Sequence, residues 1–450
     1  RTFGHSVTYV SMRDGLESAL TQVSHSDRES LPLQGVVHLR SLDNRDTAEL
    51  SVEEMTEQQA VNCGSLLSLV QHLAQVKERR GQVSKSLKLW VVTCNSQAVS
   101  GNESQAALAV AQTPLWGMGR VIGLEHPEFW GGLIDLESGI AAEQASQVVL
   151  SELRAEDKET QVAYRQGVRH VARLVRSKLA RPSDALQSIH LTIRGDASYL
   201  VTGGLGGLGL QVARWLVERG ARHLILPGRQ GIRTPEQQQS VDELTNQGVT
   251  VEIAQVDVAD EAGMRALFAR IAESEVTLKG IFHTAGVLDD GILVNQSWER
   301  FERVMAAKVQ GSWLLHQLSA ELELEQMVYF SSLASLLGSP GQGNYAAANA
   351  FMDGLAHYRR QQGLAALSIN WGAWAEVGMA ARNRQVQLEA QERLSPRLAL
   401  KALEQLLSQL GNTDTAQMRQ VGVFACGCAT LFVASGRSIS ANHDTQQQPD

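Results

Sequence analysis

Short apolar runs alternate with amphipathic stretches along most of the chain, and this pattern predicts strands separated by helices. Runs rich in Val, Ile and Leu occur at residues 35–39, 87–92, 199–202, 223–226, 251–253, 280–283, 327–330 and 367–370. Strands that are apolar throughout are typical of parallel sheets buried between two layers of helices. The sequence therefore predicts an α/β fold made of doubly wound sheets.

The pattern is interrupted between about residues 176 and 196, where Arg, Lys, Ser and Pro follow one another without a clear period. We therefore predict two Rossmann-like subdomains, residues 1–190 and 191–425, followed by a C-terminal segment, residues 426–450. The uncharged stretch 420–436 is too short and too polar for a membrane span and is predicted to be a buried strand or helix. The Gln-rich end from residue 442 is predicted to be disordered.

Only the second subdomain carries a glycine-rich turn between a strand and a helix. The turn reads TGGLGGLG over residues 202–209, after the strand at 198–201 and before an apolar helical run at 210–217. Glycines permit a tight turn, let the backbone approach a pyrophosphate and direct a helix N-terminus at its negative charge. This context predicts a dinucleotide site formed by Thr202, Gly203, Leu205, Gly206, Gly207, Leu208 and Gly209.

The first subdomain has no phosphate-binding loop after either of its clear strands. Gly117, Gly119 and Gly123 lie in a helical stretch, where glycine more often permits close packing than binds a ligand. Residues 1–190 are therefore predicted to form a truncated, cofactor-free Rossmann unit that supports the second. The segment Gly4-His5-Ser6 lacks the preceding strand and the final glycine of a serine-hydrolase elbow, so it is not interpreted as a nucleophile.

The residues after the next strands bear on the choice of cofactor. NAD-binding proteins usually carry an acidic residue at the end of the second strand, whereas this chain has Arg229 after Pro227-Gly228. A guanidinium suits a 2′-phosphate, which predicts NADPH. Asp257, with Val258 beside it, is placed to accept a hydrogen bond from the adenine amine.

Polar residues that follow the later strands form a candidate catalytic group, because open α/β sheets bind ligands at that edge. Carbonyl reduction needs a hydride source, an acid and donors that hold the oxygen. Tyr345 is the predicted proton donor, and a nearby ammonium, Lys308, would lower its pKa. Ser332 would orient the carbonyl, and Asn349, four residues after Tyr345, would fix Lys308 or a relay water.

Taken together, the motifs resemble the ketoreductase domain of modular type I polyketide synthases, a branch of the short-chain dehydrogenase/reductase superfamily. The resemblance covers nearly the whole chain and is carried by residues 35–42, 115–136, 202–209, 283–287, 308–311, 330–332, 338–349 and 371–374. Most short-chain reductases place lysine four residues after the tyrosine. The family exchanges lysine and asparagine, as Lys308 and Asn349 do here, although Gly228 departs from the serine of many relatives.

The resemblance implies a complete NADPH-binding reductase fold in the second subdomain, with Ala285 and Gly286 also at the cofactor. It implies reduction of a β-ketoacyl thioester, held by phosphopantetheine on an acyl carrier protein, to the 3-hydroxyacyl thioester during polyketide biosynthesis, beside neighbouring synthase domains. The residues expected near the substrate are Leu288, Asp289, Asp290, Leu337, Pro340 and Gln342. The segment after Trp374 is expected to form a lid.

Two of these positions bear on stereochemistry. Leu288-Asp289-Asp290 is similar to the motif of B-type members, which deliver a D-configured hydroxyl, and Leu337 stands where A-type members carry tryptophan. The resemblance therefore implies a B-type ketoreductase.

Composition excludes several other classes of protein. The 450 residues are 43% hydrophobic and 20% charged, with a formal net charge of −8 and a pI near 5.9, which argues against nucleic-acid or membrane partners. Four cysteines, at 63, 94, 426 and 428, are too few for a disulfide-stapled fold and favour a cytoplasmic setting. The last two lack further ligands, so no metal is expected. A start without Met predicts a segment of something longer.

Two other functions stay open. A free-standing short-chain alcohol dehydrogenase would act on a diffusible substrate, but it would not need the first 190 residues. A catalytically silent scaffold domain of a synthase could tolerate the loss of Tyr345, Lys308 or the glycine turn, all of which are present. Oxidation of NADPH by a β-ketoacyl thioester surrogate separates these alternatives.

Overall fold

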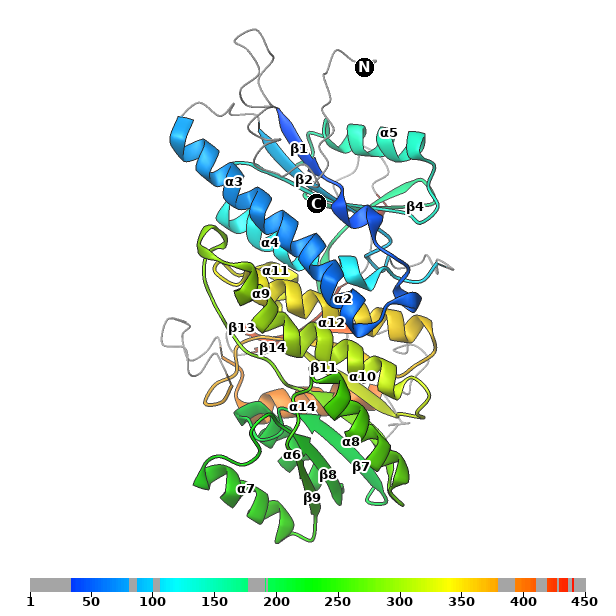
Figure 1. Ribbon diagram of the computed structural model, residues 1–450, viewed down its shortest axis with the longest axis vertical. Coiled ribbons are helices and arrows are strands. Elements are labelled where there is room, and N and C mark those ends of the chain that lie inside the picture. Colours follow the sequence, from blue (N-terminus) through cyan, green and yellow to red (C-terminus); the bar gives the residue numbers. More distant parts are fainter. Residues whose placement is uncertain are drawn as a thin grey trace, which may run out of the picture.

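Two twisted sheets, each covered by helices, account for most of the chain in the computed structural model (Figure 1). The structure describes residues 34–80, 87–99, 106–176, 191, 193–378, 393–409, 419–426, 429–435 and 439–440. The expected elbow at Gly4, the lid beyond Gly378, Cys428 and the Gln-rich end lie outside the described residues. Two Rossmann-like units with mainly parallel strands confirm the predicted α/β fold class.

The first sheet has the strand order β1-β2-β3-β4-β5-β15. Its strands are β1 (Gly35–His38), β2 (Lys88–Cys94), β3 (Trp130–Leu136), β4 (Gln161–Arg165), β5 (Val168–Val171) and β15 (Ile439–Ser440). The pairs from β1 to β4 are parallel, whereas β5 and β15 join antiparallel. One face packs against α2 (Val52–Gln59), α3 (Ser65–Arg80) and α4 (Pro114–Glu125), and the other against α5 (Ala142–Glu152).

The second sheet has the order β6-β14-β13-β12-β11-β10-β7-β8-β9. Its strands are β6 (Leu174–Arg176), β7 (Ala197–Thr202), β8 (His223–Pro227), β9 (Thr250–Ala254), β10 (Thr277–His283), β11 (Gln326–Ser332), β12 (Leu367–Trp371), β13 (Gln420–Cys426) and β14 (Ala429–Ser435). All pairs from β9 to β13 are parallel. The strand order reverses between β7 and β10, which is where doubly wound sheets bind their ligands.

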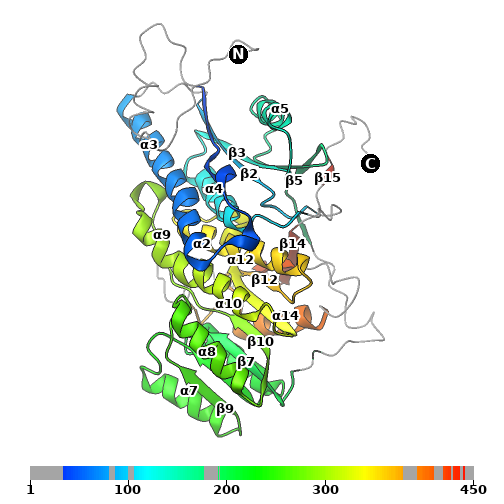
Figure 2. The ribbon, with the colours of Figure 1, turned by 45° about the vertical axis from the view of Figure 1, so that its right-hand side comes forward.

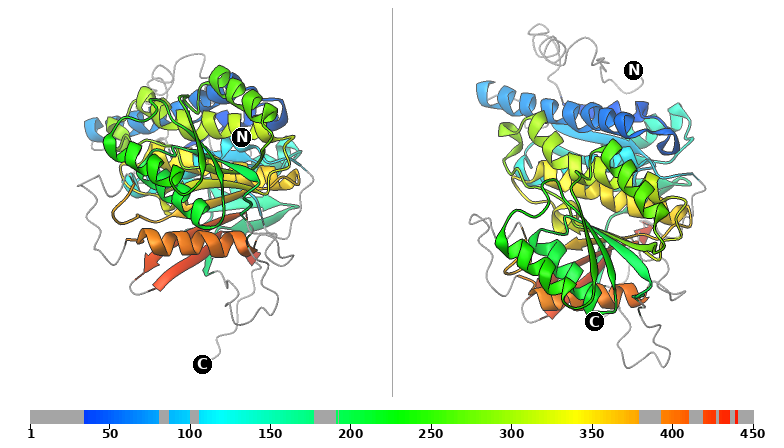
Figure 3. Two further views of the ribbon diagram at one scale, coloured as in Figure 1. Left: turned by 90° about the horizontal axis from the view of Figure 1, so that it is seen from below. Right: turned by 60° about the horizontal axis from the view of Figure 1, so that its bottom comes forward.

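Helices cover both faces of this second sheet (Figures 1 and 2). One face carries α8 (Glu261–Glu273), α9 (Trp298–Met305), α10 (Gly311–Ser319) and α12 (Gly343–Gln361), and the short helix α11 (Leu333–Leu337) precedes α12. The other face carries α6 (Gly207–Glu218), α7 (Pro235–Thr245) and α14 (Pro396–Gln409), the orange helix in Figure 3. The described helices include none that is long and apolar enough to span a bilayer.

The two units share one hydrophobic core, because α4 of the first unit packs directly on α12 of the second. A Cβ added at Gly117 would lie 2.6 Å from the carbonyl carbon of Ala346, and one at Gly119 would lie 2.8 Å from Leu133. A Cβ at Gly123 would lie 2.9 Å from Trp130. The prediction that these three glycines permit close packing is confirmed.

The C-terminal part of the described chain links both sheets. The uncharged stretch predicted to be strand or helix forms β13 and β14, which pair antiparallel. β14 then pairs with β6, which precedes the second unit in the chain, and β15 pairs with β5 of the first sheet. The chain therefore crosses between the units more than once.

Candidate active site

The glycine-rich turn leads from β7 into α6, and its backbone is too crowded for other residues. Gly203 has φ +65°, and a Cβ there would lie 3.1 Å from the backbone of Ala285. A Cβ at Gly209 would lie 2.6 Å from the Cα of Gly204. Gly206 provides the N-cap of α6 without a side-chain hydrogen bond, so the first N–H groups of the helix have no side-chain cap. An uncapped helix N-terminus beside a glycine turn suits a phosphate group.

The ends of β7 and β10 are tied together beside this turn. Thr202 Oγ1 and His283 Nδ1 lie 2.8 Å apart, and Thr284 Oγ1 donates to the Thr202 carbonyl at 2.7 Å. Burial, with a smaller contribution from Lys308, lowers the pKa of His283 to about 3, so the imidazole is neutral at neutral pH. The ends of β7 and β10, between which the strand order reverses, are therefore joined by the uncharged pair of Thr202 and His283.

Two further segments border the turn. Gln237 Nε2, from the first turn of α7, donates to the Leu205 carbonyl at 2.9 Å. The Val377-Gly378 segment lies against α6, since a Cβ at Gly207 would be 3.3 Å from Gly378 N, and a Cβ at Gly378 would be 3.3 Å from Leu208. The described start of the expected lid thus lies over the N-terminus of α6.

Arg229 and Asp257 lie at neighbouring strand ends and approach each other. The distance from Arg229 Nε to Asp257 Oδ2 is 3.9 Å, and the side chains are 64% and 40% exposed. Asp257 Oδ1 also accepts from the backbone N–H of Ala259 at 3.0 Å. Val258 is buried and packs against α10, where a Cβ at Gly311 would lie 2.8 Å from Val258 Cγ1. The structure therefore brings the three residues predicted for adenosine recognition to one edge of the sheet.

Lys308 lies in a π-helical turn, Ala306–Gln310, between α9 and α10. Its side chain is 2% exposed, and Nζ donates to the Phe330 carbonyl at 3.1 Å. Nζ is also 5.4 Å from the centroid of the Tyr345 ring. A Cβ at Gly286 would lie only 2.7 Å from Lys308 Cε, so a larger residue there would clash with the lysine side chain. Burial lowers the pKa of Lys308 to about 7.

Tyr345 is in the first turn of α12, close to Ser332 and Asn349. Burial raises the pKa of the Tyr345 phenol to about 12, although Asn349 and Ser332 act in the opposite direction. The prediction that Lys308 would lower this pKa is therefore wrong for this structure. The physical reason is that burial disfavours the phenolate and also weakens the charge on Lys308. The phenol stays protonated at neutral pH, which is the form that can donate a proton.

Ser332 and Asn349 flank this tyrosine from two different elements. Ser332 ends β11 and caps α11, because its Oγ accepts from the N–H of Ala334 at 3.2 Å. Asn349 Nδ2 donates to the Tyr345 backbone carbonyl at 2.7 Å. Asn349 Oδ1 is buried and has no hydrogen-bond partner within the described part of the chain. The described residues include no direct Lys308–Asn349 hydrogen bond, and the hydrogen bond that Lys308 Nζ makes is to the Phe330 carbonyl.

The two carboxylates of the segment 288–290 are held by different partners. Asp289 pairs with Arg300 and Arg303 of α9 at 2.7 and 2.6 Å. Asp290 accepts from Gln342 Nε2 at 3.3 Å, and burial raises its pKa. Neither is a freely solvated turn residue. Of the remaining residues predicted near the substrate, Leu288 directly precedes this pair, Leu337 is the exposed last residue of α11, and Pro340 is exposed between α11 and α12.

Comparison with known proteins agrees with this geometry. Residues 197–376 match the family model of the KR domain, and residues 10–174 match that of the Rossmann fold domain of the polyketide synthase extender module SpnB. A solved A1-type ketoreductase is 33% identical with a TM-score of 0.76, and the match covers 92% of this chain and 81% of that one. The chain belongs to the ketoreductase domains of modular polyketide synthases.

Two other relatives differ greatly in length. A solved A-type ketoreductase from a modular polyketide synthase is 37% identical with a TM-score of 0.69, covering 80% of this chain and 72% of that one. Polyketide synthase GfsA of Streptomyces halstedii is 41% identical over 302 residues, which is 67% of this chain. The ketoreductase spans only 4% of the length of that relative.

Asp353 of the ketoreductase is a buried polar residue that sequence reasoning missed. Its carboxylate accepts from Ser335 Oγ and Ser368 Oγ, each at 2.6 Å, and from Asn370 Nδ2 at 2.8 Å. Burial raises the pKa of this carboxyl group. The residue joins α12 to α11 and β12, four residues after Asn349 and eight after Tyr345 on the same helix. Its signal in the sequence is the four-residue spacing of 345, 349 and 353 on one helix face.

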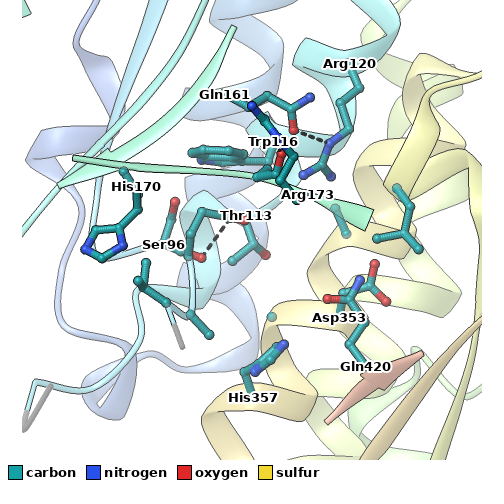
Figure 4. A pocket seen from close by; sticks show the side chains of 18 of the residues that line it. Ser96, Thr113, Trp116, Arg120, Gln161, His170, Arg173, Asp353, His357 and Gln420 are labelled. Carbon is teal, nitrogen blue, oxygen red and sulfur yellow. Dashed lines mark hydrogen bonds between the residues drawn. The ribbon is translucent and has the colours of Figure 1, made fainter. Parts of the chain in front are cut away.

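A cavity of about 380 Å³ lies at the junction of the two units of the ketoreductase, between α4, α12 and the β4–β5 hairpin (Figure 4). Arg120, Asp353 and His357 line it, and Arg120 Nε donates to Gln161 Oε1 at 2.8 Å. Leu337, predicted to lie near the substrate, also lines this cavity, whereas Tyr345 and the glycine turn do not. The cavity is therefore separate from the tyrosine and lysine site.

Proposed function

We propose that this ketoreductase uses NADPH to reduce the β-keto group of an acyl thioester carried by phosphopantetheine on an acyl carrier protein. The product is the 3-hydroxyacyl thioester. The observation that carries the proposal is the partly buried Tyr345 with Lys308 beneath its ring and Ser332 beside it, together with the raised pKa that keeps the phenol protonated. The proposed division assigns residues 1–190 to support, 191–425 to catalysis and 426–450 to the C-terminal segment.

The residues present fit a dinucleotide. The uncapped N-terminus of α6 and the glycine turn suit the pyrophosphate. Arg229 suits a 2′-phosphate, Asp257 and Val258 the adenine, and Ala285 with Gly286 the part of the cofactor nearest Lys308. When bound, NADPH supplies the hydride that reduces the carbonyl carbon.

The protein groups handle the oxygen and the proton. Ser332 Oγ donates a hydrogen bond to the substrate carbonyl oxygen, which holds it near Tyr345. The Tyr345 hydroxyl then gives its proton to the developing alkoxide. Lys308 and the unpartnered Asn349 Oδ1 hold a water between them, and this water returns a proton to the tyrosine. The Lys308 ammonium, whose Nζ lies 5.4 Å from the centroid of the Tyr345 ring, supplies the proton that this water passes on.

The proposed stereochemistry is that of the B-type, with a D-configured hydroxyl. Its support is the segment Leu288-Asp289-Asp290, which Arg300 and Arg303 fix through Asp289 and which Gln342 fixes through Asp290. A second support is Leu337, which stands where A-type members carry tryptophan.

The test is a reduction assay with the chain as it stands. NADPH and a β-ketoacyl thioester surrogate are mixed, loss of NADPH absorbance is followed, and the product is resolved on a chiral column. We expect NADPH oxidation and a D-configured product. An L-configured product would reject the B-type assignment, and no oxidation would favour the silent scaffold.

The pKa of Lys308 predicts how the reaction depends on pH. Because the reduction needs the ammonium and its pKa is lowered to about 7, kcat should fall as pH rises from 6 to 9 through that value. Lys308→Met should be slower at every pH and should lack this inflection. The measurement is a pH–rate profile of both proteins at saturating NADPH and thioester. A wild-type profile that stays level up to pH 9 contradicts the proposed role.

Arg229 predicts the choice between the two nicotinamide cofactors. Arg229→Ala should raise KM for NADPH by about 10–100-fold, the loss expected for a charge-assisted contact, and should leave KM for NADH nearly unchanged. Arg265→Ala, which removes an exposed arginine of α8, is the matched control. Equal effects of Arg229→Ala on both cofactors would show that Arg229 does not meet the 2′-phosphate.

A further inference from the structure

Glu125, the last residue of α4, reaches from the first unit to two loops of the second. Its Oε1 accepts a hydrogen bond from the backbone N–H of Gly341, and its Oε2 accepts one from the N–H of Leu293, each at 2.7 Å. A single carboxylate thus joins two segments that are far apart in sequence. Hydrogen bonds to an ionised acceptor are stronger than those between neutral groups.

The two loops are those that border the proposed substrate site. Residues 284–297 connect β10 to α9 and include Asp290, while residues 338–342 lead into α12 and Tyr345. They also contact each other directly, because the Gly291 N–H donates to the Gly341 carbonyl at 2.7 Å. The two loops are therefore hydrogen-bonded to each other, and both are hydrogen-bonded to the Glu125 carboxylate.

A second residue of the first unit forms hydrogen bonds with backbone carbonyls of the loop 284–297. Gln71 Nε2, on α3, donates to the carbonyls of Leu293 and Gln296 at 2.9 and 2.8 Å. The Leu293 side chain is fully buried against the start of α12, where a Cβ at Gly343 would lie 2.5 Å from it. Both backbone groups of Leu293 are thus held by the first unit, one by Glu125 and one by Gln71.

We propose that Glu125 is a positioning residue, which holds the two loops in a fixed relation and thereby sets how the keto group is presented to Tyr345. It contacts no reacting atom, and the inference rests on the proposed function. The first unit then contributes more than an apolar surface, because α4 lies along α11 and α12 and ends at the loops themselves (Figure 1). Loss of the two Glu125 hydrogen bonds should change substrate binding and the ratio of the hydroxyl epimers more than the rate of proton transfer.

The test uses Glu125→Gln, which keeps the size of the side chain. An amide has only one acceptor oxygen, so its NH₂ group faces one of the two N–H donors and one hydrogen bond is lost. We expect KM for the thioester surrogate to rise about 3–10-fold, with kcat within about twofold and KM for NADPH unchanged. The fraction of the minor hydroxyl epimer should rise severalfold.

Amide hydrogen exchange gives a readout that does not depend on activity. Exchange in the peptides containing Leu293 and Gly341 should be about tenfold faster in Glu125→Gln than in the wild type. Gln71→Ala should shift KM and epimer ratio in the same direction. Glu143→Gln, on exposed helix α5, makes the same chemical change away from the loops and should leave KM for the thioester, the epimer ratio and amide exchange unchanged.

The outcomes separate this inference from the proposed function. A wild-type protein that reduces the thioester, together with a Glu125→Gln variant of unchanged KM, epimer ratio and exchange, overturns the positioning role and leaves the function intact. A wild-type protein that does not reduce the thioester rejects the proposed function. In that case exchange at the two amides alone decides whether Glu125 holds the loops.

Discussion

Replacing Tyr345 with phenylalanine is expected to lower kcat by about 10²–10⁴-fold, the usual contribution of a positioned general acid. The ring would keep its place above Lys308, whose Nζ is 5.4 Å from the centroid, so the fold should not change. Only the hydroxyl is removed, and its raised pKa of about 12 keeps it protonated in the wild type. The missing proton donor therefore accounts for the whole expected loss.

The measurement is kcat for the thioester surrogate, together with the Kd for NADPH from its fluorescence. Tyr345→Phe should bind NADPH as tightly as the wild type. Tyr164→Phe is the matched control, because it removes a hydroxyl that bonds Glu152 in the first unit and should leave kcat unchanged. Undiminished turnover by Tyr345→Phe would remove this residue from the proposed mechanism.

Gly117→Ala is expected to damage both stability and activity, although the residue lies in the supporting unit. The added methyl would overlap the backbone carbonyl of Ala346, the neighbour of Tyr345 on α12. Since backbone cannot rotate away as a side chain can, α4 and α12 must separate. Overpacking of this kind costs about 1–3 kcal/mol in the free energy of unfolding. The shift of α12 should also reduce kcat, because it moves Tyr345 relative to Ser332.

Denaturant unfolding and kcat are the two measurements for this variant. Gly64→Ala is the control, because the nearest atom to its methyl would be in the Trp298 side chain, at 3.3 Å, and it should therefore cost less free energy of unfolding than Gly117→Ala. A Gly117→Ala protein that is as stable and as active as the wild type would show that the two helices can move apart freely.

The sequence predicted features that depend on residues close together in the chain. The glycine turn is such a feature, because the strand, the turn and the helix at residues 198–217 are continuous and each has its own signal. The fold class followed from the repeated apolar strands in the same way. The spacing of Tyr345 and Asn349 placed both on one face of α12, which the structure confirms.

Features that depend on distant contacts were not predicted. The raised pKa of Tyr345 arises from burial by several elements, and the position of Lys308 could not reveal it. Glu125 belongs to no sequence motif. Its two partners are backbone N–H groups, which every residue except proline has, so the residue types at 293 and 341 do not reveal the contacts. Arg300 was missed for a similar reason, because it pairs with Asp289, eleven positions earlier in the chain, across a segment that has no regular period.

The way the chain crosses between the two sheets affects where this ketoreductase can be joined to a related ketoreductase in a chimera. A junction placed at residue 190 would take β5 from one parent and its partner β15 from the other. The same junction would separate β6 from β14. A chimera cut there must therefore rebuild two strand pairings between sequences that did not evolve together, whereas a crossover outside residues 34–440 keeps both pairings within one parent.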